Sequence, residues 1–142
     1  MRLRLDKVVR VVAVGIKRVY SLVLTDEGLY LIQTGRAGAL KHYRLDNARQ
    51  LLIEQPDDRG VKEVQANERR LETQPLDELA RLKDNYFIRL EAIEDVELRP
   101  LKKDPEMWIG VTGSEHHLFF PLSSYEEVQT LQRALSKWLG LR

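Results

Sequence analysis

The sequence predicts an α+β domain: an antiparallel PH-like β-barrel or sandwich capped by a C-terminal amphipathic helix. Two patterns support this fold class. β-branched and aromatic residues dominate from Lys7 to Thr34 and again after Asn85, which is typical of strands. A charged segment with helical spacing interrupts them at about residues 46–84, and a second helical pattern ends the chain at 124–139.

Length and composition fit one domain covering residues 1–142, because domains of about 100 to 150 residues are the commonest. The 43% hydrophobic residues are enough to fill one core. The absence of cysteine excludes disulfides, thiolate nucleophiles and thiolate metal sites. No apolar run approaches the ~20 residues that span a bilayer, and Met1–Asp6 is not followed by a signal-peptide pattern. We therefore expect a cytoplasmic protein.

The net charge of +1 is unevenly distributed. Residues 1–44 hold nine basic and three acidic residues, whereas residues 45–98 hold eight basic and fourteen acidic ones. This asymmetry has two interpretations. The basic third is a face for nucleic acid or lipid, or two parts of one domain attract each other.

The first strands are expected at Val8–Val14, Tyr20–Thr25 and Gly28–Gln33. Thr25 to Gly28 joins the last two. Because glycine follows two positions after Asp26, we predict a type I turn with Gly28 in the left-handed conformation. The stretch Gly35 to Gly38 is then predicted to let the chain leave the sheet.

The charged middle segment is predicted to be a helical insertion at about residues 46–84. Its apolar residues form three groups, at Leu51–Ile53, Val61–Leu71 and Leu76–Leu82. Pro75 suits the first turn of the third helix, where Asp77 and Glu78 complement the helix dipole. Because the apolar stripes are narrow, the insertion is expected to lie on the rest of the domain, and its deletion is expected to leave a folded monomer.

The strand pattern then returns in four stretches, Tyr86–Leu90, Ile93–Leu98, Met107–Thr112 and His117–Leu122. Pro100 to Pro105 is predicted to be a charged loop, and Gly113 to Glu115 a turn.

The C-terminal helix is marked by a capping box, with Ser124 as N-cap and Glu127 three residues later. Gly140 is placed to terminate it. Its apolar face makes it a principal part of the core, at about 1.5 to 3 kcal/mol per large buried side chain. The residues assigned to the structural core are Phe120, Leu131, Leu135 and Trp138, and truncation before Trp138 is expected to abolish folding.

Three stretches resemble bacterial PH-like (pleckstrin-homology-like) and GRAM-like domains: "LVLTDEGLYLIQ" at 22–33, "FIRLEAIEDVEL" at 87–98 and "HLFFPLSSYEEVQTLQRALSKWLG" at 117–140. The resemblance implies short antiparallel strands closing on themselves, followed by one helix. The charged segment departs from a compact PH-like domain and would be an insertion.

No catalytic residue, metal site or cofactor is predicted. Adjacent strand residues point to opposite faces, so His116 and His117 cannot share a metal, and Glu115–His117 is interpreted as part of a hairpin. Replacing both histidines by alanine is therefore expected to change stability and activity little. An enzyme hypothesis survives only if the distant His42 lies near one of them.

The basic residues that we consider for anion or lipid binding are Lys17, Arg18, Arg36 and Lys41. Lys17 and Arg18 are expected in the first loop. The resemblance implies this role, because basic residues of that loop bind phosphoinositide head groups in lipid-binding PH domains.

The leading functional hypothesis is a non-catalytic protein-interaction or assembly module, with self-association through the 46–84 insertion as one form. The alternative is binding of anionic lipid or nucleic acid through the basic N-terminal third.

Overall fold

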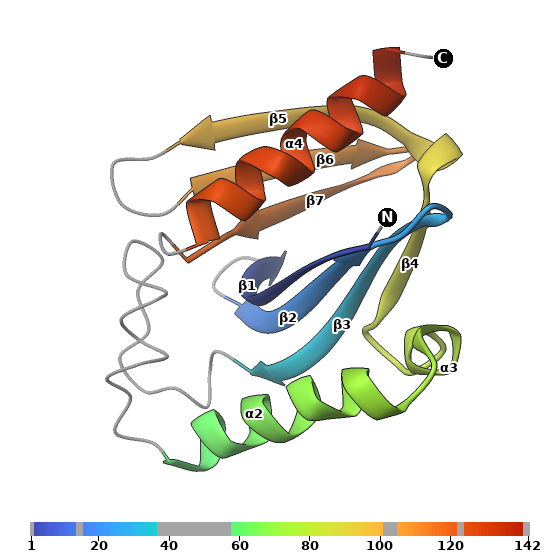
Figure 1. The fold of residues 1–142 in the computed structure, drawn as a ribbon. Helices are drawn as coiled ribbons and strands as arrows, with labels where there is room; N and C mark the ends of the chain where they lie inside the picture. The colour runs from blue at the N-terminus through green and yellow to red at the C-terminus, as the bar shows by residue number, and fades with distance from the viewer. Residues whose placement is uncertain (1, 14–15, 37–57, 101–104, 122–123, 141–142) are drawn as a thin grey trace.

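The computed structural model describes residues 2–13, 16–36, 58–100, 105–121 and 124–140 (Figure 1). These residues form one seven-stranded antiparallel sheet in the order β4-β3-β2-β1-β7-β6-β5. The strands are β1 (Leu3–Ala13), β2 (Ile16–Leu24), β3 (Gly28–Arg36), β4 (Tyr86–Arg89), β5 (Ile93–Pro100), β6 (Pro105–Val111) and β7 (Ser114–Phe119). The helices are α2 (Asp58–Thr73), α3 (Leu76–Ala80) and α4 (Tyr125–Gly140). The α+β prediction is confirmed, and the sheet is open, with β4 and β5 as its edges.

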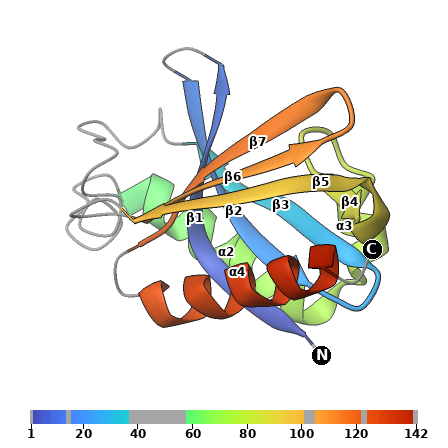
Figure 2. The same ribbon diagram turned by 90° about the horizontal axis from the view of Figure 1, so that it is seen from above.

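Helix α4 closes the inner face of the sheet. Strands β5–β7 cross over β1–β3 (Figure 2), and one hydrophobic core joins both groups of strands to the helix. Phe120, Leu131 and Leu135 are fully buried in this core, as predicted, while Trp138 is partly buried and packs against it. The helix begins directly after Ser124 and ends at Gly140, as the sequence predicts.

Helices α2 and α3 form the insertion between β3 and β4, and they cover the outer face of β2 and β3 (Figure 1). A second core lies there, with members Val23, Tyr30, Ile32, Leu71 and Leu79. Deleting the insertion would expose three of these side chains on the sheet. This packing argues against the expectation that the truncated chain folds. The first apolar group of the predicted insertion, Leu51–Ile53, lies outside the described residues.

The β2–β3 hairpin is present, but its turn differs from the predicted one. The N–H of Thr25 donates to the carbonyl of Gly28 at 2.9 Å, and the Thr25 Oγ1 accepts from the N–H groups of Glu27 and Gly28 at 3.2 and 3.4 Å. Gly28 does not have a positive φ, so the left-handed assignment is wrong. Glycine is required instead because a Cβ there would collide with the carbonyl oxygen of Ile88.

Several strand boundaries also differ from the predicted ones. Strand β1 begins at Leu3, ahead of the predicted start, and β3 continues through Gly35 and Arg36 instead of leaving the sheet. Gly35 serves close packing, since a Cβ on it would lie 2.6 Å from Cγ2 of Val64 on α2. The β6–β7 turn falls at Thr112 and Gly113, where Gly113 has φ +79°, so Ser114 and Glu115 lie in β7.

The ends of the predicted charged loop, Pro100 and Pro105, are strand residues that pair with each other across β5 and β6. Among the described helices, none combines the length and the apolar character needed to span a membrane.

Candidate interaction surface

The predicted basic residues lie on strands and not in a loop. Lys17 and Arg18 belong to β2, which corrects their assignment to the first loop, because β1 and β2 are long enough to include them. Arg18 is opposite Arg10 of β1 and opposite Arg36 of β3. The ladder therefore aligns three arginines across three strands. Lys41, the fourth predicted residue, lies outside the described ranges.

Internal contacts engage two of these arginines. Arg18 Nη1 lies 2.8 Å from Oδ2 of Asp84, and the Arg10 guanidinium carbon lies 4.4 Å from the centre of the Tyr86 ring. Arg10 Nε also donates to Nδ1 of His116 at 3.1 Å. Like charges directly opposite in a sheet are destabilising, and these contacts offset that cost. Arg10 and Arg18 thus already have roles within the fold.

The two adjacent histidines lie on opposite faces of β7, as strand alternation predicts. His116 points inward and is 5% exposed, with its ring 5.4 Å from that of Tyr86. Burial, and then the charge of Arg10, lower the pKa of His116 to about 4, so its ring is neutral at neutral pH. This burial argues against the expectation that replacing His116 leaves stability unchanged.

His117 lies on the outer face, stacked on Trp108 with ring centroids 3.6 Å apart. Its Nε2 is hydrogen-bonded to Oε1 of Glu106, which also accepts from Trp108 Nε1 at 3.1 Å. In the part of the chain that the structure describes, no group of three or more His, Asp or Glu side chains is placed to hold a metal. His42 lies outside that part, so its position relative to His116 and His117 is not described.

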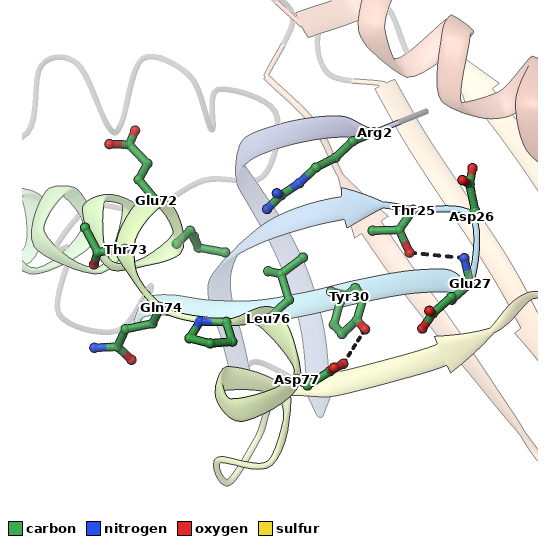
Figure 3. Close-up of a pocket in the computed structure, with 12 residues that line it drawn as sticks. Arg2, Thr25, Asp26, Glu27, Tyr30, Glu72, Thr73, Gln74, Leu76 and Asp77 are labelled. Carbon is green, nitrogen blue, oxygen red and sulfur yellow. Dashed lines mark hydrogen bonds between the residues drawn. The ribbon is translucent and has the colours of Figure 1, made fainter.

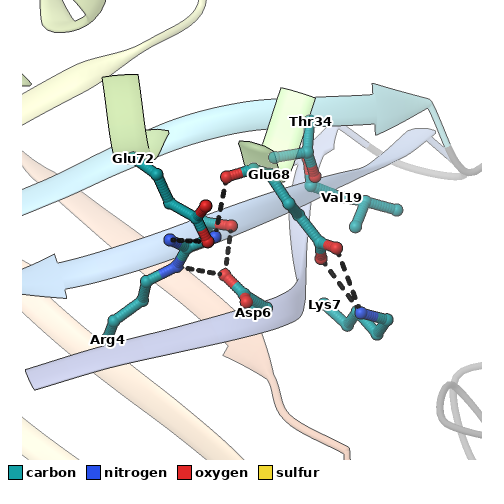
Figure 4. Close-up of polar contacts among 8 residues, drawn as sticks. Arg4, Asp6, Lys7, Val19, Thr34, Glu68 and Glu72 are labelled. Atoms are coloured by element: carbon teal, nitrogen blue, oxygen red, sulfur yellow. Dashed lines mark hydrogen bonds and ion pairs between the residues drawn. The ribbon is translucent and has the colours of Figure 1, made fainter. Parts of the chain in front are cut away.

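A polar network joins β1 to α2 on the outer face (Figure 4). Arg4 Nε bonds Oδ1 of Asp6 at 2.8 Å, and Arg4 Nη2 donates to the carbonyl of Glu68 at 2.8 Å. Lys7 Nζ pairs with the Glu68 carboxylate at 3.1 Å. Burial raises the pKa of Glu68. The network holds α2 in register with β1.

Among the described residues, three ion pairs link the basic first third of the chain to its acidic middle. Lys7 pairs with Glu68 and Arg18 with Asp84, and Arg4 Nη1 lies 3.8 Å from Oε1 of Glu72. The charge asymmetry seen in the sequence is thus partly used inside the domain, as the second interpretation proposed. Ion pairs of this exposure contribute about 0 to 1 kcal/mol each.

A hollow of about 540 Å³, here called the turn hollow, lies between the β2–β3 turn, the end of α2 and the start of α3 (Figure 3). Tyr30 and Leu71 contribute its apolar lining. The Tyr30 hydroxyl donates to Oδ1 of Asp77 at 2.6 Å, and burial together with this bond raises the pKa of Tyr30 to about 12. Tyr30 therefore remains a neutral hydrogen-bond donor at neutral pH.

A second hollow of about 800 Å³, the edge hollow, shares Asp26 and Glu27 with the first and is also lined by Phe87 and Arg89 of β4. The ring of Phe87 packs on Tyr30 at 4.6 Å between centroids. Two large hydrophobic side chains are exposed in the described ranges, Leu82 at 48% and Phe87 at 37%. We call the two hollows, Leu82 and the β4 edge together the β4 surface.

The sequence did not identify this surface. The pattern placed Phe87 on a strand but did not show which face or edge it would occupy. An available signal was alternation in β4: Tyr86 and Ile88 point to the core, so Phe87 between them had to face outward.

A scan of protein-family models and searches of curated proteins and solved structures find no significant match to this chain.

Proposed function

We propose that the chain is a non-catalytic PH-like module that binds a partner protein in the cytoplasm through the β4 surface. Support for the PH-like assignment comes from the seven antiparallel strands followed by one helix packed on the inner face of the sheet. The resemblance implies this order of elements, with α2 and α3 as the added element, although it also implies strands that close on themselves and the observed sheet is open.

The observation that carries the binding role is the exposed ring of Phe87 in the lining of the edge hollow, with a second exposed apolar residue, Leu82, five positions earlier in the chain. Leu82 and Phe87 lie in the short segment running from the end of α3 into β4, and Phe87 lines the edge hollow. Exposed hydrophobic side chains beside a concave surface are typical of interaction sites.

The outward face of α2 is a weaker candidate within the same insertion. It carries exposed polar residues, among them Lys62, Glu63, Gln65 and Arg69. Charged residues are depleted at the centres of protein interfaces, whereas aromatic residues are enriched. The docking role of the insertion is thus assigned to its α3 end.

The test compares two double variants in quantitative cross-linking of the full chain in its native cell. Leu82→Ser with Phe87→Ser is expected to lose the cross-linked partner, whereas Lys62→Ser with Glu63→Ser on α2 keeps it. Both variants are first checked for an unchanged circular dichroism spectrum and cooperative unfolding. Equal partner recovery from both would show that the β4 surface is not the binding site.

A second candidate function, binding of anionic lipid or nucleic acid, is favoured by the aligned row of Arg10, Arg18 and Arg36. Its test is binding to phosphatidylserine vesicles and to a single-stranded oligonucleotide at low salt, because such binding is salt-sensitive. If this candidate function is correct, the native chain binds at low salt and the double variant Lys17→Glu with Arg18→Glu does not. Absence of binding at low salt eliminates it.

A further inference from the structure

Strand β4 leaves one side of its backbone open at the edge of the sheet. It has four residues and pairs with β3 alone among the described strands. The N–H of Leu90, just after β4, donates to the carbonyl of Glu27, just before β3, at 3.4 Å, so the backbone of Leu90 faces β3. Alternate residues of an antiparallel strand direct their backbone groups to opposite sides. Ile88, two residues before Leu90, therefore also bonds toward β3, while the N–H groups of Phe87 and Arg89 point away from it.

The two edges of the sheet differ in their side chains. Strand β5 presents exposed charged residues, Glu94, Asp95, Glu97 and Arg99. Charges of this kind protect an edge from pairing with other chains. Strand β4 presents an exposed aromatic ring, Phe87, and a single exposed charge, Arg89, beside its open backbone groups. The β4 edge is therefore the one suited to an added strand.

The charge around β4 indicates what kind of strand fits. Of the seven charged residues that line the two hollows, five are acidic and two basic. The acidic residues are Asp26, Glu27, Glu72, Asp77 and Glu91. A strand with lysine or arginine at alternate positions matches this field, whereas an acidic strand is repelled.

We propose that the β4 edge binds an extended segment of a partner protein, with lysine or arginine alternating with apolar residues, by strand addition. The segment pairs with the N–H and C=O groups of Phe87 and with the N–H of Arg89, whose own carbonyl begins the 3-10 helix Leu90–Ala92. Its apolar side chains pack on Phe87, and its basic side chains lie over the acidic hollows. This proposal rests on the proposed function and specifies the chemistry of the partner.

Arg89 allows a selective test, because its φ of −64° is the value that proline adopts. Arg89→Pro removes the outward N–H without removing a bond to β3. Arg89→Ala is the matched control, since it removes the same side chain but keeps the N–H. The probe is a fluorescent hexapeptide of alternating lysine and valine, compared with its glutamate–valine counterpart by fluorescence anisotropy.

We expect the lysine–valine peptide to bind the native chain and Arg89→Ala, with affinity weaker by about tenfold or more for Arg89→Pro. The glutamate–valine peptide is expected to bind at least about tenfold more weakly than the lysine–valine peptide. Equal affinity of the proline and alanine variants, or of the two peptides, overturns the proposal. A dimer that forms without peptide and is lost in Arg89→Pro also overturns it, because a second copy is then the occupant.

A second pair of variants covers the case in which Arg89→Pro does not fold. Phe87→Lys is expected to bind the lysine–valine peptide about tenfold more weakly than Phe87→Glu does. Equal affinity of these two variants contradicts the proposal. Partner binding through the β4 surface and strand addition at the β4 edge can also be disproved independently of each other. If Leu82→Ser with Phe87→Ser loses the cellular partner but Arg89→Pro retains it, strand addition is wrong and the β4 surface stands.

Discussion

Burial determines the chemistry of His116. Its Nδ1 accepts from Arg10 Nε, so the neutral ring carries its proton on Nε2. Protonating Nδ1 would break this bond and place a second positive charge beside a guanidinium in a buried position. Burial, and then the charge of Arg10, lower the pKa to about 4, and the ring functions as a neutral acceptor that holds Arg10 against Tyr86.

We predict an acid-sensitive contribution to stability from this residue. Because the pKa of His116 falls from 6.5 to about 4 on folding, its stabilising share is complete above about pH 6.5 and is lost as pH falls toward 4. The loss amounts to about 3 kcal/mol. Urea unfolding at several pH values in this window checks it.

His116→Gln keeps an acceptor that does not titrate, so it is expected to lose less stability over the same window than the native chain. His117→Gln, on the outer face, is the control and keeps the acid-dependent loss. Identical pH profiles for the native chain and His116→Gln would contradict this assignment.

The space around Gly28 leaves no room for a side chain at this position. We predict that Gly28→Ala destabilises the fold by about 1 to 3 kcal/mol, because its Cβ would overlap the backbone of β4. Gly110→Ala is the control, since the nearest atom to its Cβ, Cβ of Asp95, would be at 3.6 Å. Chemical denaturation measures both, and a cost of Gly28→Ala no larger than that of Gly110→Ala would show that the β3–β4 contact is not close.

At the scale of elements, the insertion is part of the structure and not an appendage. Helix α2 is fastened to β1 by the Lys7–Glu68 pair and to β3 by the approach of Val64 to Gly35. Leu71 and Leu79 complete the second core. Strands β2 and β3 are therefore buried on both faces, which explains why their sequence is almost continuously apolar.

We predict that Leu71→Ala on α2 destabilises the whole domain by about 2 to 5 kcal/mol. Gln65→Ala, at an exposed position of the same helix, is expected to change stability by less than about 0.5 kcal/mol. Both are measured by denaturant unfolding followed by tryptophan fluorescence, which reports on Trp108 in β6 and Trp138 in α4, both outside α2. A local change in α2 without loss of global stability would contradict this role.

Sequence patterns predicted where the strands and helices lie better than they predicted which of them are adjacent. Periodicity locates strands and helices because it is a local property, and the capping helix after Ser124 and the helices near Val64 and Leu79 were predicted for this reason. How far a strand extends and which strand lies at an edge both depend on pairing between distant segments. Lys17 and Arg18 were therefore assigned to a loop, and the exposure of Phe87 was not foreseen.

At the scale of the whole molecule, the described sheet has covered regions and one open region. Helix α4 covers the inner face, α2 and α3 cover the outer face of β2 and β3, and charged residues protect β5. The β4 edge combines open backbone groups, an exposed aromatic ring and acidic hollows. It is the place where this architecture best accommodates another chain.

Amide hydrogen exchange at β4 tests strand addition most directly. In the free chain, the amides of Phe87 and Arg89 are expected to exchange rapidly, while the amide of Ile88, bonded to β3, is protected. Saturation with the lysine–valine peptide is expected to slow amide exchange at Phe87 and Arg89 by about tenfold or more and to leave the exchange rate of Ile88 unchanged. If the peptide binds but the amides of Phe87 and Arg89 exchange as fast as before, the β4 edge does not receive a strand.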